Sequence, residues 1–487
     1  MIVSTSRRIR RWLFLLASLA LTLSTVAIHA DIGVVIADPT TVGAGIFTNA
    51  GHSLVYLSGV CPDSPIHARL CRPGEQGSIV STYPNFRESR PYAWNMIPLN
   101  LYVEGLMNPD NRLLYASRPV KTALEITARI EFFRPVCAGK QCPEDAHSYW
   151  RDLVASTADR DVFIYAIRST RAQDEAVVHW LNASVNVNHY QGITNNCAMF
   201  TRSLINAVFP HSIHRDLVND LGMMSPKSAA RSFSHWAHRH PELDFYSLHF
   251  AQKPGSLPRC GLARSGTEQA IHTKKYLIPA AMIGDHEVAG SFFVAYMLTG
   301  RFNLYKEYTK YPQPSVMKME QSAHAAKQTG AQRQWHLVEA SIARQRTANL
   351  GTPTEWAAYR EEFAVLEAGA RKQGLFSRQE KIEIPKSFAT GSVTIDENGN
   401  PWLILGSAES QRQIGLTSAN LFAPGSDPRL AVQLMMGRVA YALTARKHMR
   451  EDLELFQADW NLLQMAYQDL NPPEELAITP SREIPAQ

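Results

Sequence analysis

Hydrophobic patterning along the chain predicts a sheet-forming N-terminal region. Residues 31–60 contain a short apolar run, IGVVIAD, and an alternating segment, GHSLVYLSG, and both end in turn residues. The apolar run DVFIYAIR at 161–168 predicts a further strand. Prolines divide 79–130 into short strand-like pieces such as NLYVEGLM, so we expect loop-rich sheet rather than helix there.

Two amphipathic patterns follow these strands. The segment STRAQDEAVVHWLN at 169–182 combines a capping residue, early acids and spaced apolar positions, which predicts a helix. In the next segment, TNNCAMFTRSLINAVFP, Asn195 and Asn196 are good N-caps and Pro210 is a stop. Cys197 is therefore expected in the first turn of a half-buried helix. The apolar stripe of this helix consists of Phe200, Leu204, Ile205 and Val208.

The C-terminal part has a different composition. After Pro312 the chain becomes rich in Ala, Gln, Glu, Lys and Arg with helical patterning, so we place a domain boundary near Tyr311. Residues 311–471 are expected to be mainly helical, including a long helix over 428–470. A β-hairpin is expected near 392–406, where two apolar runs flank an Asn-Gly turn. The polar, proline-containing tail 472–487 is expected to be disordered.

The first 30 residues have the pattern of a secretory signal peptide. Four arginines precede an apolar run from Trp12 to Ile28, which ends in small residues before the first acid, Asp31. We expect cleavage after Ala30 and export to the periplasm or cell envelope. If the segment stays uncleaved it would anchor the protein, because about 17 apolar residues are near the lower limit for spanning a bilayer.

Composition and charge narrow the class of protein. The chain has 487 residues, 45% hydrophobic and 19% charged, which is enough apolar material for a large core or two. The net charge is +5, and the arginines of the N-terminal segment supply four of these charges, which leaves +1 for the rest. This near-neutral remainder excludes the basic surface that a nucleic-acid partner requires.

Export to an oxidising compartment makes the six cysteines candidates for disulfides. Cys61 and Cys71 bracket a loop rich in Pro, Asp and Arg, and Cys137 and Cys142 bracket the short turn CAGKQC. We expect a disulfide within each of these pairs. Cys260 remains as a member of a third bridge or as a buried thiol.

Cys197 is the candidate nucleophile. The backbone N–H groups and the dipole at a helix N-terminus favour thiolate over thiol, and they can also hold an oxyanion. His52 follows a glycine at the start of a predicted strand and is the candidate base of a Cys–His pair. Taken alone, each residue is more often structural: Cys197 as a small buried hydrophobe and His52 as a hydrogen-bonded histidine.

No metal and no cofactor are predicted from the sequence. The cluster HWAHRH contains His235, His238 and His240, and the first two lie on one face of a helix. No cysteine or carboxylate stands at ligand spacing beside them, so we do not assign a metal site.

These motifs together resemble the Lnb N-terminal periplasmic domain family. They are Gly51–His52 opening an apolar strand, the strand VFIYAIR, Tyr190, and Asn196–Cys197 opening a helix, over residues 31–209. That family belongs to the circularly permuted, papain-like (NlpC/P60-related) cysteine enzymes. The resemblance implies an α+β fold with a permuted papain-like domain over 31–310, extensions included. It also implies that His52 is the base, Cys197 the nucleophile and Asn196 the cap that aims Cys197.

The resemblance implies catalysis through a thioester acyl-enzyme. The leading expectation is an acyltransferase of the cell envelope, with a phospholipid donor, a lipoprotein amine as acceptor and peripheral contact with the membrane. The alternatives are a peptidoglycan amidohydrolase or cysteine peptidase, and a non-catalytic scaffold whose helical C-terminal half docks a partner. The polar group that orients His52 stays open among Ser81, Asn85, Glu88 and Glu104.

Overall fold

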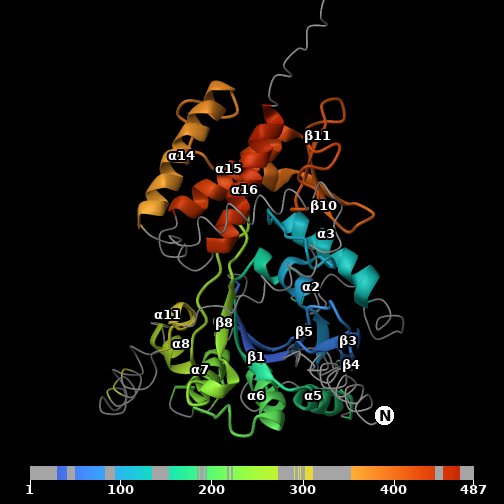
Figure 1. Cartoon of the computed structure of the whole chain (residues 1–487), viewed down its shortest axis with the longest axis vertical. Helices are drawn as coiled ribbons and strands as arrows, with labels where there is room; N and C mark the ends of the chain where they lie inside the picture. Colours follow the sequence, from blue (N-terminus) through green and yellow to red (C-terminus); the bar gives the residue numbers. More distant parts are fainter. Residues whose placement is uncertain are drawn as a thin grey trace, which may run out of the picture.

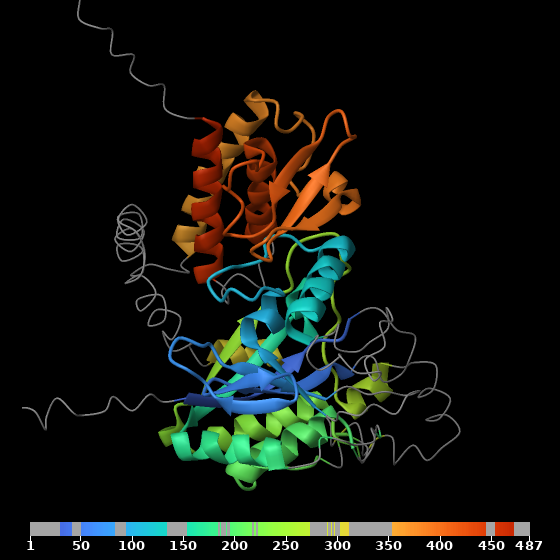
Figure 2. The same cartoon turned by 90° about the vertical axis from the view of Figure 1, so that its right-hand side faces the viewer.

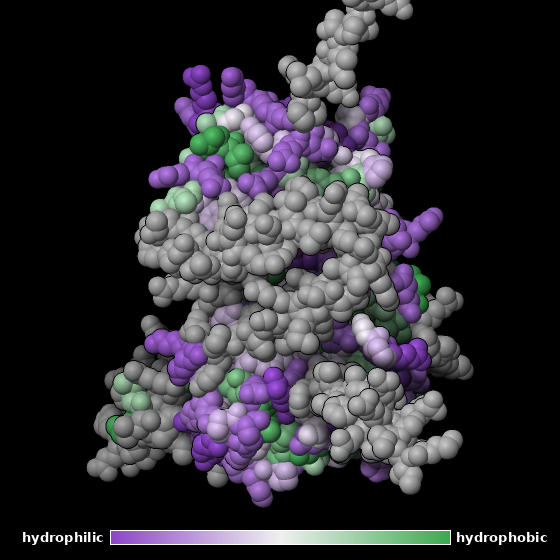
Figure 3. Space-filling model, viewed as in Figure 1, coloured by the Kyte–Doolittle hydropathy of each residue, from purple (hydrophilic) through white to green (hydrophobic). Residues whose placement is uncertain are grey.

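The structure is a computed structural model of the chain. Apart from a few isolated positions, it describes residues 30–40, 50–82, 94–133, 153–183, 195–216, 219–220, 223–272, 302–310, 353–444 and 453–471. Residues 1–29 of the expected signal peptide (residues 1–30) and the expected disordered tail 472–487 lie outside this set. None of the described helices is long and apolar enough to cross a membrane. On the face seen in Figure 3, the described surface shows small hydrophobic areas among hydrophilic groups.

A six-stranded antiparallel sheet organises the N-terminal part of this mixed α/β protein (Figure 1). The strand order is β6-β5-β2-β1-β7-β8, so the first strand lies inside the sheet between β2 and β7. The strands are β1 (Ala30–Ala37), β2 (His52–Leu57), β5 (Ser78–Ser81), β6 (Asn95–Pro98), β7 (Val162–Ser169) and β8 (Tyr246–Phe250).

Helices cover both faces of this sheet, which explains why its strands are apolar on both sides (Figure 2). Helices α5 (Arg171–Ala183), α6 (Cys197–Val208) and α7 (Pro226–Ala237) pack on one face with Val34, Val55 and Tyr165. Helices α2 (Leu99–Glu104) and α3 (Arg118–Ala128) lie on the other face with Val35, Leu54 and Ile164. The short helix α11 (Leu304–Lys310) packs against β8, and the short helix α8 (Gly266–His272) contacts α7, where Lys227 donates to Glu268 at 2.7 Å.

One glycine is required by the close approach of β1 and β7. A Cβ atom added at Gly33 would lie 2.5 Å from the carbonyl oxygen of Tyr165. Any side chain there would push apart the strands that pair Val34 with Tyr165.

The expectation of sheet without helix over 79–130 is wrong. Strands β5 and β6 are present, but NLYVE forms most of α2, and α3 follows after Ser117. Residues 101–104 are all buried, so the polar and apolar alternation that distinguishes a strand from a helix is absent. Gly105 ends α2 in the left-handed region, at φ 76°, and Ser117 caps α3 by accepting from the N–H of Val120.

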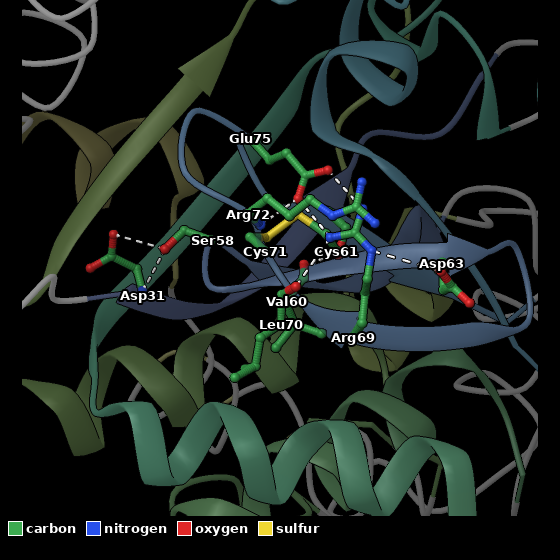
Figure 4. Close-up of a disulfide and its surroundings, with 11 residues drawn as sticks. Asp31, Ser58, Val60, Cys61, Asp63, Arg69, Leu70, Cys71, Arg72 and Glu75 are labelled. Carbon is green, nitrogen blue, oxygen red and sulfur yellow. Dashed lines mark hydrogen bonds and ion pairs between the residues drawn. A yellow bond between two sulfur atoms is a disulfide. The ribbon is translucent and has the colours of Figure 1, made fainter.

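The predicted disulfide between Cys61 and Cys71 is confirmed (Figure 4). It closes the hairpin of β3 (Val60–Ser64) and β4 (His67–Leu70). Arg69 reinforces the loop by donating to both carboxylate oxygens of Glu75, each at 2.7 Å. The second expected pair, Cys137 and Cys142, lies outside the described residues.

Removing this disulfide should destabilise the protein measurably. In the double variant Cys61→Ala/Cys71→Ala, we expect the free energy of unfolding to fall by about 2–3 kcal/mol, because the bond closes a short loop in the unfolded chain. Chemical denaturation measures the difference. A reductant should lower the stability of the wild-type protein by more than that of the variant; an equal midpoint for both proteins without reductant would contradict the prediction.

The C-terminal part combines three helices with a second sheet. The sheet contains β9 (Ser392–Ile395), β10 (Pro401–Leu405) and β11 (Arg412–Gly415), and its first two strands form the hairpin at the predicted place. The helices are α14 (Pro353–Lys372), α15 (Pro428–Thr444) and α16 (Leu453–Leu470). The expected single long helix over 428–470 is therefore two helices, and these two pack against each other.

The C-terminal part packs directly on the N-terminal part (Figure 2). The ring of Tyr115 meets that of Phe388 edge to face, with 5.7 Å between centroids. The backbone N–H of Leu114 donates to the carbonyl of Leu416 at 2.8 Å. One hydrophobic cluster accordingly contains residues of both parts. The expected boundary at Tyr311 lies outside the described residues.

Candidate active site

Helix α6 begins at Cys197, and Asn196 fixes this end of the helix. The side-chain oxygen of Asn196 accepts from the N–H of Met199 at 2.9 Å, as an N-cap does. Its amide nitrogen donates to the carbonyl of Met224 at 2.8 Å. Since both ends of the amide are engaged, Asn196 holds the first turn of α6, and with it Cys197, in one orientation.

The sulfur of Cys197 lies in a pocket of backbone N–H groups. The N–H groups of Ser53 and Ala198 both donate hydrogen bonds to it. The residue is 7% exposed, and this burial raises the pKa of the thiol above its usual range despite these hydrogen bonds. The N–H groups at the helix N-terminus do lower the pKa, as expected, but burial outweighs them, so Cys197 is a protonated thiol in the resting protein.

His52 is the first residue of β2 and follows Gly51, whose φ of 74° lies in the left-handed region. A Cβ at Gly51 would also lie 2.7 Å from the carbonyl oxygen of Ala37, so glycine is required here. Burial, helped by the charge of Arg160, lowers the pKa of His52 to about 3. The imidazole is therefore neutral at physiological pH, and in the resting protein it is a weaker base than an exposed histidine.

Ser81 is the described hydrogen-bond partner of the imidazole among the four residues considered for this role. Its Oγ lies 2.7 Å from Nε2 of His52. Glu104 is engaged elsewhere, because it accepts from Lys253 at 2.6 Å and from the N–H of Leu113 at 2.8 Å. Asn85 and Glu88 lie outside the described residues, as does Tyr190. The pairing of β2 with β5 brings Ser81 to His52, and the register of these two strands cannot be deduced from the sequence.

Two hydrogen bonds connect the start of β2 to α6. Besides the contact of its N–H with the sulfur of Cys197, Ser53 places its Oγ 3.0 Å from Oγ1 of Thr201. Since Ser53 directly follows His52, the proposed base and nucleophile are held on adjoining segments. The structure thus brings His52, Cys197, Asn196 and Ser81 into one region.

The histidine cluster near the end of α7 has a carboxylate beside one of its members. Nε2 of His238 lies 3.1 Å from Oε1 of Glu307, a carboxylate distant in sequence. Within the described part of the chain, no group of three close metal-ligating atoms includes His235, His238 or His240. The same holds for His52 and Cys197.

Comparisons with known proteins give little similarity. No family model matches the chain, and no curated protein matches it. Among solved structures, the crystal structure of the type VI secretion system effector TseH aligns with 47% of this chain and 95% of its own length. The sequence identity is 12% and the TM-score 0.24. At this level the similarity carries no argument about activity, so the function is argued from the residues of the chain itself.

The raised pKa of Cys197 leads to an expected pH dependence of alkylation. Below its pKa a thiol is mostly protonated, so a raised pKa lowers the reactive thiolate fraction at neutral pH. In a Cys260→Ser background, we expect iodoacetamide to label folded Cys197 more than about tenfold more slowly at pH 7 than the unfolded protein. The rate should keep rising above pH 9. A fast phase that saturates below pH 8 would contradict the prediction.

Proposed function

We propose that this protein is a cysteine-dependent enzyme that forms a thioester acyl-enzyme on Cys197. The observation that carries the proposal is the arrangement of Cys197 at the capped N-terminus of α6. Its sulfur accepts from the N–H of Ser53, directly after His52, and Ser81 bonds the imidazole. Nucleophile, base and orienting group are the parts that thiol-based acyl transfer requires.

We assign activation of the thiol to the neutral imidazole of His52, although burial lowers the pKa of this imidazole to about 3 and makes it a weak base in the resting protein. Because Nε2 of His52 bonds Ser81, Nδ1 is the nitrogen assigned to proton transfer. Nδ1 takes the thiol proton as the sulfur of Cys197 attacks the carbonyl carbon of an ester or amide. The protonated imidazole then returns this proton to the departing alcohol or amine. An acceptor amine, or water, attacks the thioester and restores the thiol.

The helix N-terminus supports charge that develops during this reaction. The N–H groups of Ser53 and Ala198 stabilise negative charge on the sulfur, and the dipole of α6 favours an oxyanion beside its first turn. These groups are fixed by β2 and by the Asn196 cap, so they need no rearrangement when charge appears.

For the substrate, we propose an acyl group of a phospholipid, transferred to a free amine of a lipoprotein at the cell envelope. Burial of Cys197 supports transfer over hydrolysis, because a thioester shielded from water survives until the acceptor amine arrives. The order of His52 before Cys197 supports a permuted papain-like arrangement, with the strand of the base preceding the helix of the nucleophile. The N-terminal pattern supports export.

The decisive experiment is detection of the acyl-enzyme. The purified protein is incubated with phospholipid vesicles, and its intact mass is measured. We expect a mass increase of one acyl chain, located on Cys197, removed by hydroxylamine and discharged by a peptide with a free N-terminal amine. The Cys197→Ala variant should give no adduct.

A parallel incubation with purified peptidoglycan separates the two substrate classes. Release of peptides, without an adduct from vesicles, would assign the same residues to an amidohydrolase. Absence of both reactions, or an adduct on Cys260 instead, would contradict the proposed enzyme and favour a binding role.

A further inference from the structure

Three potential metal ligands from distant parts of the chain meet at one end of the sheet. Asp38 directly follows β1, Asp161 directly precedes β7, and Cys260 lies in the segment after β8. One carboxylate oxygen from each aspartate and the sulfur of Cys260 lie within 4.8 Å of one another. The other described group with close ligand atoms contains Cys61 and Cys71, whose sulfurs are joined in a disulfide.

The carboxylate of Asp38 is the feature that indicates a bound cation. The residue is 0% exposed, and its Oδ1 accepts from the N–H of Ala263 at 2.8 Å. Its Oδ2 is buried and has no hydrogen-bond partner among the described residues. A buried carboxylate oxygen without a partner is costly, and an oxygen of Asp161, a second carboxylate, lies within 4.8 Å of one of its oxygens. A bound cation would remove this cost.

The other two ligands are held in position by neighbours. Asp161 accepts from the N–H of Gln252 through Oδ1 and from the hydroxyl of Tyr305 through Oδ2. The side chain of Gln252 in turn accepts from the N–H of Cys260 at 2.9 Å. Hydrogen bonds of this kind orient the ligands of known metal sites and tune their affinity.

A histidine lies at the border of the group. Nε2 of His249 is 4.0 Å from Oδ1 of Asp161, and the ring is stacked on Phe163 with 4.5 Å between centroids. A small shift would bring this nitrogen into the group as a fourth ligand. Thiolate, carboxylate and imidazole together suit zinc, whereas magnesium and calcium prefer oxygen ligands alone.

We propose that Asp38, Asp161 and Cys260 bind one zinc ion, with His249 as fourth ligand. The site gives a role to Cys260, which belongs to neither of the two disulfides expected from the sequence. It also ties together segments that support the candidate active site. Asp38 follows Ala37, the register partner of His52, and Ala263 lies against the position of Gly51. The ion would therefore stabilise the strand end from which His52 projects, without taking part in the chemistry.

Zinc and cobalt binding to the whole protein, free of histidine tags and first treated with a chelator, test this proposal. Calorimetry should show one zinc ion per chain. Cobalt should give the near-ultraviolet absorption of a thiolate ligand. Asp38→Asn and Cys260→Ser should each weaken zinc binding by about 100-fold or more, and Cys260→Ser should remove the thiolate absorption.

Cys197→Ala is the matched control, because it removes the other described free thiol and should leave zinc binding and the cobalt spectrum unchanged. Absence of zinc binding by the wild-type protein would overturn the proposal, and this result does not depend on any variant folding. Thiolate absorption that persists in Cys260→Ser and disappears in Cys197→Ala would also overturn it. Because the readout is metal binding, the result is independent of whether the protein forms an acyl-enzyme.

Discussion

Replacing Cys197 with alanine is expected to lower acyl transfer by about 10⁴-fold or more, because the variant lacks the thiol to which we assign the thioester. The same variant should fold normally, since the change removes one buried sulfur and leaves the Asn196 cap in place. Turnover is measured as transfer of a labelled acyl chain from vesicles to a peptide amine, or as peptide release if peptidoglycan proves to be the substrate. Thermal unfolding of the variant monitors its fold.

Two further variants separate the catalytic role of the thiol from a general effect. Ser81→Ala should reduce turnover by about tenfold while leaving the mass of the acyl-enzyme unchanged, because it loosens His52 without removing the base. Cys260→Ser serves as the thiol control and should keep most of the activity. Full turnover by Cys197→Ala would refute the proposed mechanism.

Replacing Asp459 with asparagine is expected to lower the free energy of unfolding by about 3–5 kcal/mol. Asp459 on α16 accepts from Arg438 at 2.8 Å and from Arg112 at 2.7 Å. Burial alone would raise the pKa of Asp459, but the two guanidinium groups lower it, so the carboxylate is charged. Asparagine keeps the volume but leaves two largely buried positive charges without compensation. Chemical denaturation gives the magnitude.

The matched control for this variant is an ion pair at the surface. Glu175→Gln breaks the exposed contact between Arg171 and Glu175 in α5, and we expect a loss below about 0.5 kcal/mol. A similarly small loss for Asp459→Asn would show that the buried network does not hold α15 and α16 to the segment around Arg112.

The elements with clear periodicity could be predicted from the sequence. Strands β1, β2 and β7 are apolar runs ended by turn residues, and α6 carries both a capping asparagine and an apolar stripe. Helix α2 could not be predicted, because it is short and its residues 101–104 are all buried, which leaves no pattern of period 3.6. That α15 and α16 are two separate helices could not be predicted either, because no proline lies between them in the sequence.

Some residues of the candidate site could likewise be predicted from the sequence, and others could not. Cys197, His52 and Asn196 carry local signals, namely a cap, a glycine and a helix start. Ser81 becomes a partner of His52 only through the pairing of two strands, and the low polarity that keeps the thiol protonated arises from packing. The group of Asp38, Asp161 and Cys260 had no signal at all, because its members come from three separate segments and have no common spacing.

The position of β1 inside the sheet affects the order in which the protein can fold. β1 is the first described strand in the chain, yet it pairs Ala30 with Ser169 of β7. During synthesis, this very apolar strand is made well over a hundred residues before its second neighbour, β7, exists. Non-local pairing of this kind slows folding, and until β7 is in place the unpaired edge of β1 is exposed to aggregation. A chaperone that covers this edge until β7 has been made would therefore raise the yield of folded protein.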